Sequence, residues 1–235
     1  MQVISSKENE IVKKVRKLKE KKFRDLENAY LIEGIKLVKE AMAENAKIKQ
    51  IIMCEDYTDN VELDKDTLYE IAKYNVAYVT RNILNFITEV KTPQGIIAVV
   101  EKKNKKLEDT TALVDFSQDI ILALDDIQDP GNLGTILRTA DSANLKQILL
   151  SKNSADPYNP KVVRSTMGAI FRVNIIEVEN LKDELKKAQA NGFKVMVTSL
   201  DTQNSIYDTD YYQKVIVIGN EANGVSKEIQ DMADE

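Results

Sequence analysis

Short apolar runs alternate along the chain with amphipathic segments, and this alternation predicts an α/β protein. In the first part of the chain, apolar runs predict strands at 30–34, 48–54, 76–80 and 94–100. Apolar positions three and four residues apart predict helices between them, at 35–42 and 62–73. Strands and helices in alternation are typical of a small α/β/α domain.

A second alternation follows in the rest of the chain. Its apolar runs predict strands at 120–124, 147–151, 173–178, 193–200 and 214–220. The segments between them predict helices at 134–144, 160–171 and 181–192. Because these strands are almost continuously apolar, we expect a parallel sheet that helices cover on both faces.

A polar stretch without periodicity, 101–111, separates the two alternations and predicts a boundary between domains 1–106 and 107–235. The first part holds 21 Lys and Arg against 17 Asp and Glu, and the second holds 12 against 21. Segment 7–24, with nine Lys and Arg, predicts a basic helix. A basic first domain suits phosphate groups, although a merely solvated basic face is an equally good interpretation.

Composition narrows the possible chemistry. The chain has one cysteine, Cys54, and no histidine, which excludes Ser-His-Asp hydrolysis, HExxH metal sites and cysteine-based zinc sites. We therefore expect no metal, and a cofactor that carries the reactive group. No apolar stretch is long enough to span a bilayer and the first residues lack a secretory pattern, so we expect a cytoplasmic protein.

Three predicted strands lead into loops rich in Gly, Asn and acidic residues. These loops occupy 124–134, 197–201 and 218–226. Ligands of open parallel sheets bind beyond the carboxyl ends of the strands, so the three loops predict a ligand site at one rim. Neither GxGxxG nor a P-loop is present, which disfavours a nicotinamide or nucleoside-triphosphate enzyme.

The loop residues carry a resemblance to a known family. NLGTILRTA (132–140) and GNEANGVS (219–226) resemble the first two motifs of the SpoU family of RNA methyltransferases, and VVRSTMGAIFRV (162–173) resembles the Arg-Ser-x-x-Gly-Ala stretch between them. YLIEGIKLVKEAM and TPQGIIAV resemble the substrate-binding domain that precedes the catalytic domain in many members. Together these matches cover most of the chain.

The resemblance implies a fold and an activity. It implies a carboxy-terminal SPOUT domain with a deep trefoil knot and a small α/β/α domain before it, related to ribosomal protein L thirty. The implied activity is transfer of a methyl group from S-adenosylmethionine to a ribose 2′-hydroxyl of rRNA, or of tRNA, by a homodimer that meets no membrane.

One part of the family pattern is not matched. Members carry a third motif, with an Ile-Pro start and a Ser-Leu-Asn core, which completes the knot and the cofactor pocket, and residues 227–235 do not match it. An RNA-binding protein on a SPOUT scaffold, without methylation, is therefore the alternative function. Binding of S-adenosylmethionine would separate the two.

The resemblance also implies roles for individual residues. The catalytic residues would be Arg138, Asn132 and Glu221, with Glu221 orienting one of the other two. The cofactor-binding residues would be Thr198, Ser199, Leu200, Ile218, Gly219, Asn220 and Gly224. The RNA-binding residues would be Arg16, Lys22, Arg24, Glu33 and Arg164. A structural ion pair is the alternative for Arg138.

Overall fold

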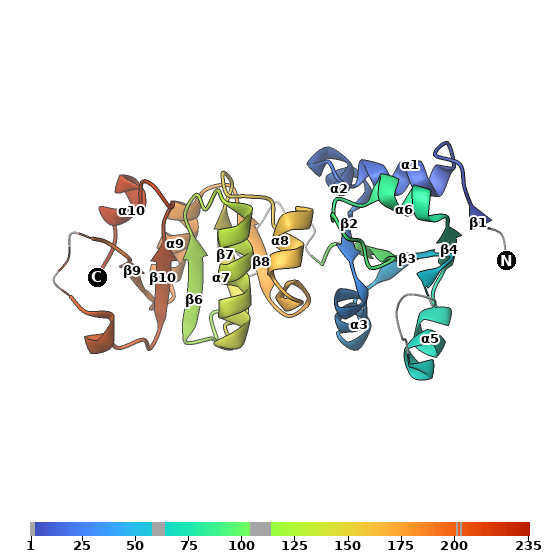
Figure 1. The fold of residues 1–235 in the computed structure, drawn as a ribbon. Helices are drawn as coiled ribbons and strands as arrows, with labels where there is room; N and C mark the ends of the chain where they lie inside the picture. Colours follow the sequence, from blue (N-terminus) through green and yellow to red (C-terminus); the bar gives the residue numbers. More distant parts are fainter. Residues whose placement is uncertain (1–2, 58–63, 104–113, 201, 203) are drawn as a thin grey trace. The chain divides into compact units, whose positions relative to one another are not determined.

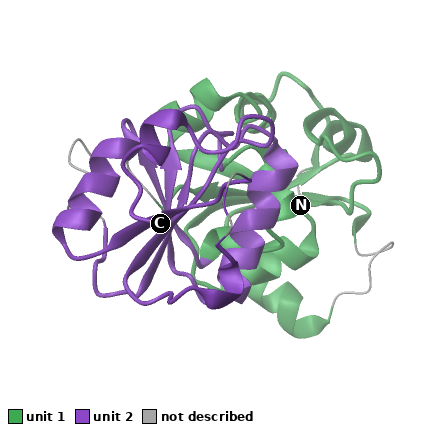
Figure 2. Cartoon of the chain, turned by 90° about the vertical axis from the view of Figure 1, so that its left-hand side faces the viewer, with its two compact units in different colours: residues 1–103, 158–171 green, residues 104–157, 172–235 purple. Residues whose placement is uncertain are grey.

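A computed structural model describes residues 3–57, 64–103, 114–200, 202 and 204–235. The chain forms two compact units (Figure 2). The first comprises Met1–Lys103 with Tyr158–Phe171, and the second comprises Asn104–Pro157 with Arg172–Glu235. The boundary predicted between residues 106 and 107 lies outside the described residues.

The first unit is built on a mixed sheet of order β1-β4-β3-β5-β2 (Figure 1). Strands β1, β4 and β3 run parallel, and β5 runs antiparallel to both β3 and β2. Its strands are β1 (Val3–Ile4), β2 (Ala29–Glu33), β3 (Ile48–Cys54), β4 (Val76–Val79) and β5 (Ile96–Glu101). Its helices before residue 104 are α1 (Glu10–Lys17), α2 (Lys21–Glu27), α3 (Ile35–Ala43), α5 (Lys65–Ala72) and α6 (Arg81–Ile87).

The single basic helix predicted over 7–24 is wrong, because the structure divides this segment into α1 and α2. The guanidinium of Arg24 explains how the break is stabilised. Its Nη1 donates to the carbonyls of Leu18 and Lys19, 3.0 Å and 2.6 Å away, just after α1 ends. Groups at a helix end that have no partner within the helix need one elsewhere, and a folded-back arginine supplies it here.

The second unit contains a sheet of five parallel strands in the order β8-β7-β6-β10-β9, which confirms the predicted parallel sheet. Its strands are β6 (Ile120–Leu124), β7 (Gln147–Ser151), β8 (Asn174–Val178), β9 (Lys194–Val197) and β10 (Lys214–Ile218). Its helices are α7 (Pro130–Ser142), α9 (Leu181–Ala190), the 3-10 turn η3 (Ile206–Asp208) and α10 (Lys227–Gln230). Ile121, Leu149, Leu185 and Val215 lie in one buried apolar cluster that stabilises the unit.

The helix predicted over 160–171 is interrupted. Helix α8 (Pro160–Ser165) ends where Met167 and Gly168 adopt φ angles of 51° and 100°, and the 3-10 turn η2 (Ala169–Phe171) follows. A left-handed pair of residues cannot continue an α-helix. This segment belongs to the first unit, where the ring of Tyr158 packs against that of Tyr30 with centroids 4.8 Å apart.

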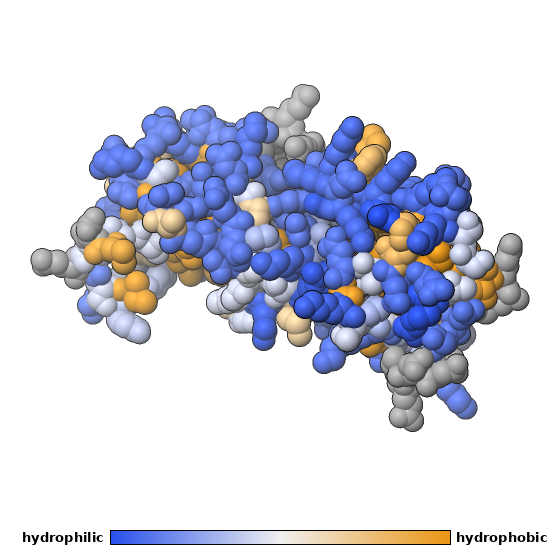
Figure 3. Space-filling model, turned by 45° about the horizontal axis from the view of Figure 1, so that its top comes forward, coloured by the Kyte–Doolittle hydropathy of each residue, from blue (hydrophilic) through white to orange (hydrophobic). Residues whose placement is uncertain are grey.

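The surface is largely hydrophilic on the face that Figure 3 shows, with small groups of apolar residues between the polar ones. The exposed large apolar side chains include Leu26, Tyr69, Met167, Leu200, Ile206, Tyr207 and Tyr212. Among the described residues, no helix combines the length and apolar character needed to cross a membrane.

Candidate functional site

The order of the parallel sheet brings two distant loops together. Strand β6 pairs with β7 on one side and with β10 on the other. The strands that follow β6 directly in the chain, β7 and β8, therefore lie on one side of it, whereas the last two strands, β9 and β10, lie on the other side. Such a change of direction opens a crevice at the carboxyl ends of the strands, where open α/β sheets bind their ligands. The loops after β6 and β10 both start at this rim.

Glu221, in the loop after β10, joins that loop to the start of α7. Its carboxylate accepts hydrogen bonds from the backbone nitrogens of Gln128 and Asp129, at 3.3 Å and 3.2 Å. It also accepts one from Nδ2 of Asn132, at 3.1 Å. Burial raises the pKa of Glu221, but these donors and its own backbone outweigh that effect and hold the pKa below its ordinary value. The ionised carboxylate is therefore the form that holds the two loops.

Asn220 makes a second connection between the same loops. Its Nδ2 donates to the carbonyl oxygen of Asp126 at 2.8 Å, while its Oδ1 accepts from the backbone nitrogens of Ala222 and Asn223. A third connection is made by Asp125, whose Oδ2 accepts from the backbone nitrogen of Ser226 at 2.7 Å. The two loops are thus fixed by side chains at both ends of residues 220–226.

Asp126 extends this network toward β7. It has a φ angle of 56°, in the left-handed region that Asp tolerates better than most residues. Its Oδ1 accepts from Oγ of Ser151 at 2.8 Å, and Ser151 Oγ accepts from the backbone nitrogen of Asp126 at 2.8 Å. The site residues predicted from the sequence include neither Asp125 nor Asp126, although an acidic pair directly after a buried strand is a usable signal.

Gly219 and Gly224 lie against each other in the loop after β10. A methyl group added to Gly219 would lie 2.1 Å from the carbonyl carbon of Gly224 and from the nitrogen of Val225. Gly224 has a φ angle of 69°, with open space where its Cβ would be. Gly219 is therefore required by close backbone contact, whereas Gly224 is favoured by its conformation.

Helix α7 begins at the rim and carries the other predicted catalytic residues. Its first turn is fixed by Asp129, which accepts from the backbone nitrogen of Asn132 at 2.9 Å, and by Pro130 at the first helical position. Arg138 lies about 9 Å further along the helix axis, given the usual rise per residue. It is exposed, and its guanidinium has no ion pair or hydrogen bond within the described chain, although its carbonyl oxygen accepts from Oγ of Ser142 at 3.0 Å.

The predicted cofactor residues after β9 line a separate cavity of about 610 Å³, in which Thr198 and Ser199 are accompanied by Ile206 and Thr209. Thr198 is tied to β10, because its backbone nitrogen and Oγ1 both donate to the carbonyl oxygen of Val217. Leu200 is fully exposed and does not line this cavity.

The other predicted cofactor residues lie at the end of β10. The carbonyl oxygen of Ile218 accepts from the backbone nitrogen of Asp125 at 2.9 Å, next to the network of Asn220 and Glu221. The predicted cofactor residues therefore fall into two groups: Thr198 and Ser199 at the cavity, and Ile218 to Gly224 in the loop after β10.

The predicted RNA-binding residues occupy different environments within the first unit. Arg16 is exposed and lies 3.8 Å above the ring of Phe86, and Lys22 is exposed on α2. Arg24, on α2, is only 2% exposed and donates to the carbonyls of Leu18 and Lys19, so its guanidinium is buried instead of lying on the surface as expected. Glu33 and Arg164 line the same cavity, which lies within the first unit.

Comparisons with known proteins identify relatives over the whole chain. Residues 119–235 match the SpoU rRNA Methylase family, and residues 9–98 match the MRM3-like substrate binding domain. The 23S rRNA (guanosine(2553)-2′-O)-methyltransferase RlmP of Bacillus subtilis (strain 168) is 32% identical over all of this chain and 88% of its own length. The mitochondrial rRNA methyltransferase 3 of Xenopus tropicalis is 34% identical over 67% of this chain, which spans 37% of that protein.

A solved structure gives the same result for the fold. The AdoMet-bound rRNA methyltransferase from Sinorhizobium meliloti superposes with a TM-score of 0.83 at 30% identity. The superposition covers 99% of this chain and 86% of that one. The similarity therefore extends over both units.

Proposed function

Because this chain belongs to the SpoU rRNA Methylase family, we propose that it transfers a methyl group from S-adenosylmethionine to a ribose 2′-hydroxyl of RNA. The relatives that support this are named for rRNA, so rRNA is the proposed substrate rather than tRNA. We further propose that the chain acts as a cytoplasmic homodimer and that its second unit has the knot of the family; both rest on family membership.

The observation that carries the proposal is the pair of loops that Glu221 and Asn220 hold together at the sheet rim. Methyl transfer to a hydroxyl needs two groups placed in line more than it needs a reactive protein side chain. S-adenosylmethionine, when bound, supplies the electrophilic methyl group. Loops already connected by hydrogen bonds can hold both reactants without reorganising.

The residues of the rim fit such a cofactor. Gly219 brings the backbone of the loop after β10 close to Gly224, so backbone groups rather than side chains form that surface. The cavity after β9 adds the Thr198 and Ser199 hydroxyls beside apolar Val197. We assign cofactor contacts to these two groups of residues and to exposed Leu200, which follows Ser199 in the chain.

Arg138 is assigned to the reacting oxygen. A guanidinium carries a positive charge and several N–H donors, so its simplest role is to bind the target phosphate and to stabilise negative charge on the 2′-oxygen while the hydroxyl proton passes to solvent water. The exposed, unpaired state of Arg138 in the described chain leaves its donors available for this. Asn132, oriented by Glu221, would contact the ribose or the cofactor.

The test combines two measurements on the same protein preparation. Calorimetry should detect binding of S-adenosylmethionine, and incubation with rRNA transcripts and a labelled methyl donor should yield labelled RNA. The labelled position should resist alkaline cleavage on its 3′ side, because a 2′-O-methyl group blocks attack on the adjacent phosphate. Tight RNA binding without cofactor binding or methyl transfer would instead support the RNA-binding alternative.

A further inference from the structure

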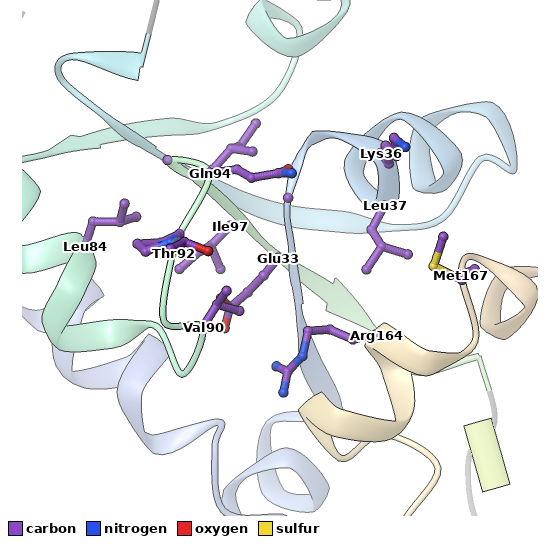
Figure 4. A pocket seen from close by; sticks show the side chains of 14 residues that line it. Glu33, Lys36, Leu37, Leu84, Val90, Thr92, Gln94, Ile97, Arg164 and Met167 are labelled. Atoms are coloured by element: carbon purple, nitrogen blue, oxygen red, sulfur yellow. The ribbon is translucent and has the colours of Figure 1, made fainter. Parts of the chain in front are cut away.

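A cavity of about 340 Å³ lies in the first unit, and none of the residues assigned to methyl transfer lines it (Figure 4). It is bordered by the end of β2, the start of α3, the loop before β5 and helix α8. Gln94 closes one side, because its Oε1 accepts from the backbone nitrogen of Ile35 at the start of α3. The volume lies at the lower end of the range for small-ligand sites, so a single nucleotide fits and a duplex does not.

The main evidence for a ligand in this cavity comes from Arg164. Its Nη1 is buried and has no hydrogen-bond partner in the described part of the chain. Buried donors in folded proteins are nearly always paired, and a charged donor loses the most when it is not. Figure 4 shows the Arg164 side chain extending from α8 toward β2, into the space that the cavity residues enclose. A ligand with an acceptor oxygen would supply the missing partner.

Glu33 adds an acceptor to the lining of the same cavity. Its Oε2 accepts from Oγ1 of Thr88, and no ion pair joins it to Arg164 among the described residues. The cavity therefore offers a carboxylate and a guanidinium that do not neutralise each other. An inorganic anion would satisfy Arg164 but not Glu33, whereas a nucleotide carries both acceptor oxygens and base N–H donors.

The walls between these two groups are apolar. Leu37, Leu84 and Val90 line the cavity, and Met167 stands at its edge with 56% of its surface exposed. Met167 is kept there by the left-handed turn that ends α8. Bases that are not stacked in a helix bind to protein by packing their faces on such apolar or aromatic side chains.

The cavity also unites two parts of the sequence that the comparisons separate. Glu33 and Gln94 lie in the region that matches a substrate binding domain, and Arg164 lies in the region that matches the methylase family. We propose that this cavity binds one unstacked nucleotide of the RNA substrate, with Arg164 on an acceptor oxygen and Glu33 on the base. This inference rests on the proposed function for the identity of the polymer.

The test measures RNA binding to the full chain by fluorescence anisotropy, with a short labelled single-stranded RNA and the same strand in a perfect duplex. Arg164→Met removes the buried charge and keeps most of the side-chain volume. Lys161→Met is the matched control, since it removes one positive charge from the same helix outside the cavity. Val90→Phe narrows the cavity without changing charge.

We expect Arg164→Met to weaken single-strand binding about tenfold, the effect of losing one hydrogen bond to a charged group. Lys161→Met should change it far less, and Val90→Phe should weaken single-strand binding but not duplex binding. Arg164→Met should melt no lower than the wild type, because it removes an unpaired buried donor. If Arg164→Met does not fold, Val90→Phe decides the question by itself.

Three results would overturn the inference: equal affinities of Arg164→Met and Lys161→Met, equal losses on single strand and duplex, or displacement of the RNA by inorganic phosphate at constant ionic strength. Its failure is distinct from that of the proposed function. If the protein transfers methyl groups but RNA affinity falls only with Lys161→Met, the proposed function stands and the nucleotide site is wrong. If RNA affinity depends on Arg164 but no methyl group is transferred, the nucleotide site stands and the proposed function is wrong.

Discussion

The rim of the parallel sheet and the cavity of the first unit treat their polar groups in opposite ways. At the rim, Glu221 and Asn220 in the loop after β10 bond to groups in the segment after β6, and exposed Arg138 remains available to a ligand. In the cavity, Arg164 has a buried donor that the described chain leaves unpaired. The hydrogen bonds that hold the rim are therefore formed before any ligand binds, whereas the buried donor in the cavity gains its partner only from a ligand.

This difference is what a methyltransferase acting on RNA requires. The chemical step gains from groups already held in the geometry of the transition state, which a satisfied network provides. Substrate selection gains from groups that only the correct ligand satisfies, because every other ligand leaves them unpaired. If the rim is rigid and the first unit depends on its ligand, variants in the two regions should behave differently.

The largest effect is expected at Arg138. Arg138→Ala should lower the rate of methyl transfer by about 100-fold or more, the effect of removing one donor to developing negative charge. The protein should remain folded, since the exposed guanidinium has no partner within the described chain. Arg138→Lys is the control, because it keeps the charge and loses the two-pronged geometry. Single-turnover rates measure the effect, and an unchanged rate in Arg138→Ala would exclude the catalytic role.

A pair of glycine variants tests the rigidity of the rim. Gly219→Ala should destabilise the second unit by about 3 kcal/mol, because its methyl group would meet backbone atoms that cannot easily move. Gly224→Ala should cost about 1 kcal/mol, since only its left-handed conformation opposes the change. Urea unfolding gives both values. Equal costs would mean that the contact at Gly219 relaxes and that the loop is softer than we infer.

The elements of the sheet could be predicted well from the sequence, whereas interruptions within helices could not. The predicted bounds of β3, β6 and β7 match the structure, because each is a continuous apolar run ended by polar residues. The break after α8 depends on Met167 adopting a left-handed conformation, which no residue preference announces. Helix α6, seven residues long, is too short for periodicity to reveal.

The rim and the first unit also differ in how far their site residues could be predicted from the sequence. The motifs place Asn132 at the start of α7 and Glu221 in the loop after β10, and the sheet order brings the two together, so their contact at 3.1 Å follows from pattern and topology. The charge of segment 7–24 does not reveal that Arg24 folds inward, because an arginine can satisfy backbone carbonyls as readily as phosphates. The cavity at Arg164 depends on tertiary packing that a single sequence does not encode locally.

Acid should weaken the contacts that Glu221 makes at the rim. The pKa of Glu221 is held below its ordinary value of 4.5, so its stabilising contribution is complete at higher pH. That contribution is lost as the pH falls through the lowered pKa, when the carboxylate gains a proton. The difference in unfolding free energy between the wild type and Glu221→Gln should therefore shrink below about pH 4.5. A constant difference down to pH 3 would show that the charge of Glu221 does not hold the loops.

The smallest effect is expected on the surface of the first unit, and it separates two neighbouring basic residues. Lys22 is exposed, so Lys22→Ala should reduce the slope of log affinity against log salt by about 0.7 to 0.9, the value for one lost phosphate contact. Arg24 is buried and bonded to Leu18 and Lys19. Arg24→Ala should therefore leave the slope unchanged and lower stability by about 2 kcal/mol. Titrations of the same RNA at several salt concentrations measure the slopes, and a change with Arg24→Ala but not with Lys22→Ala would reverse our assignment of the two residues.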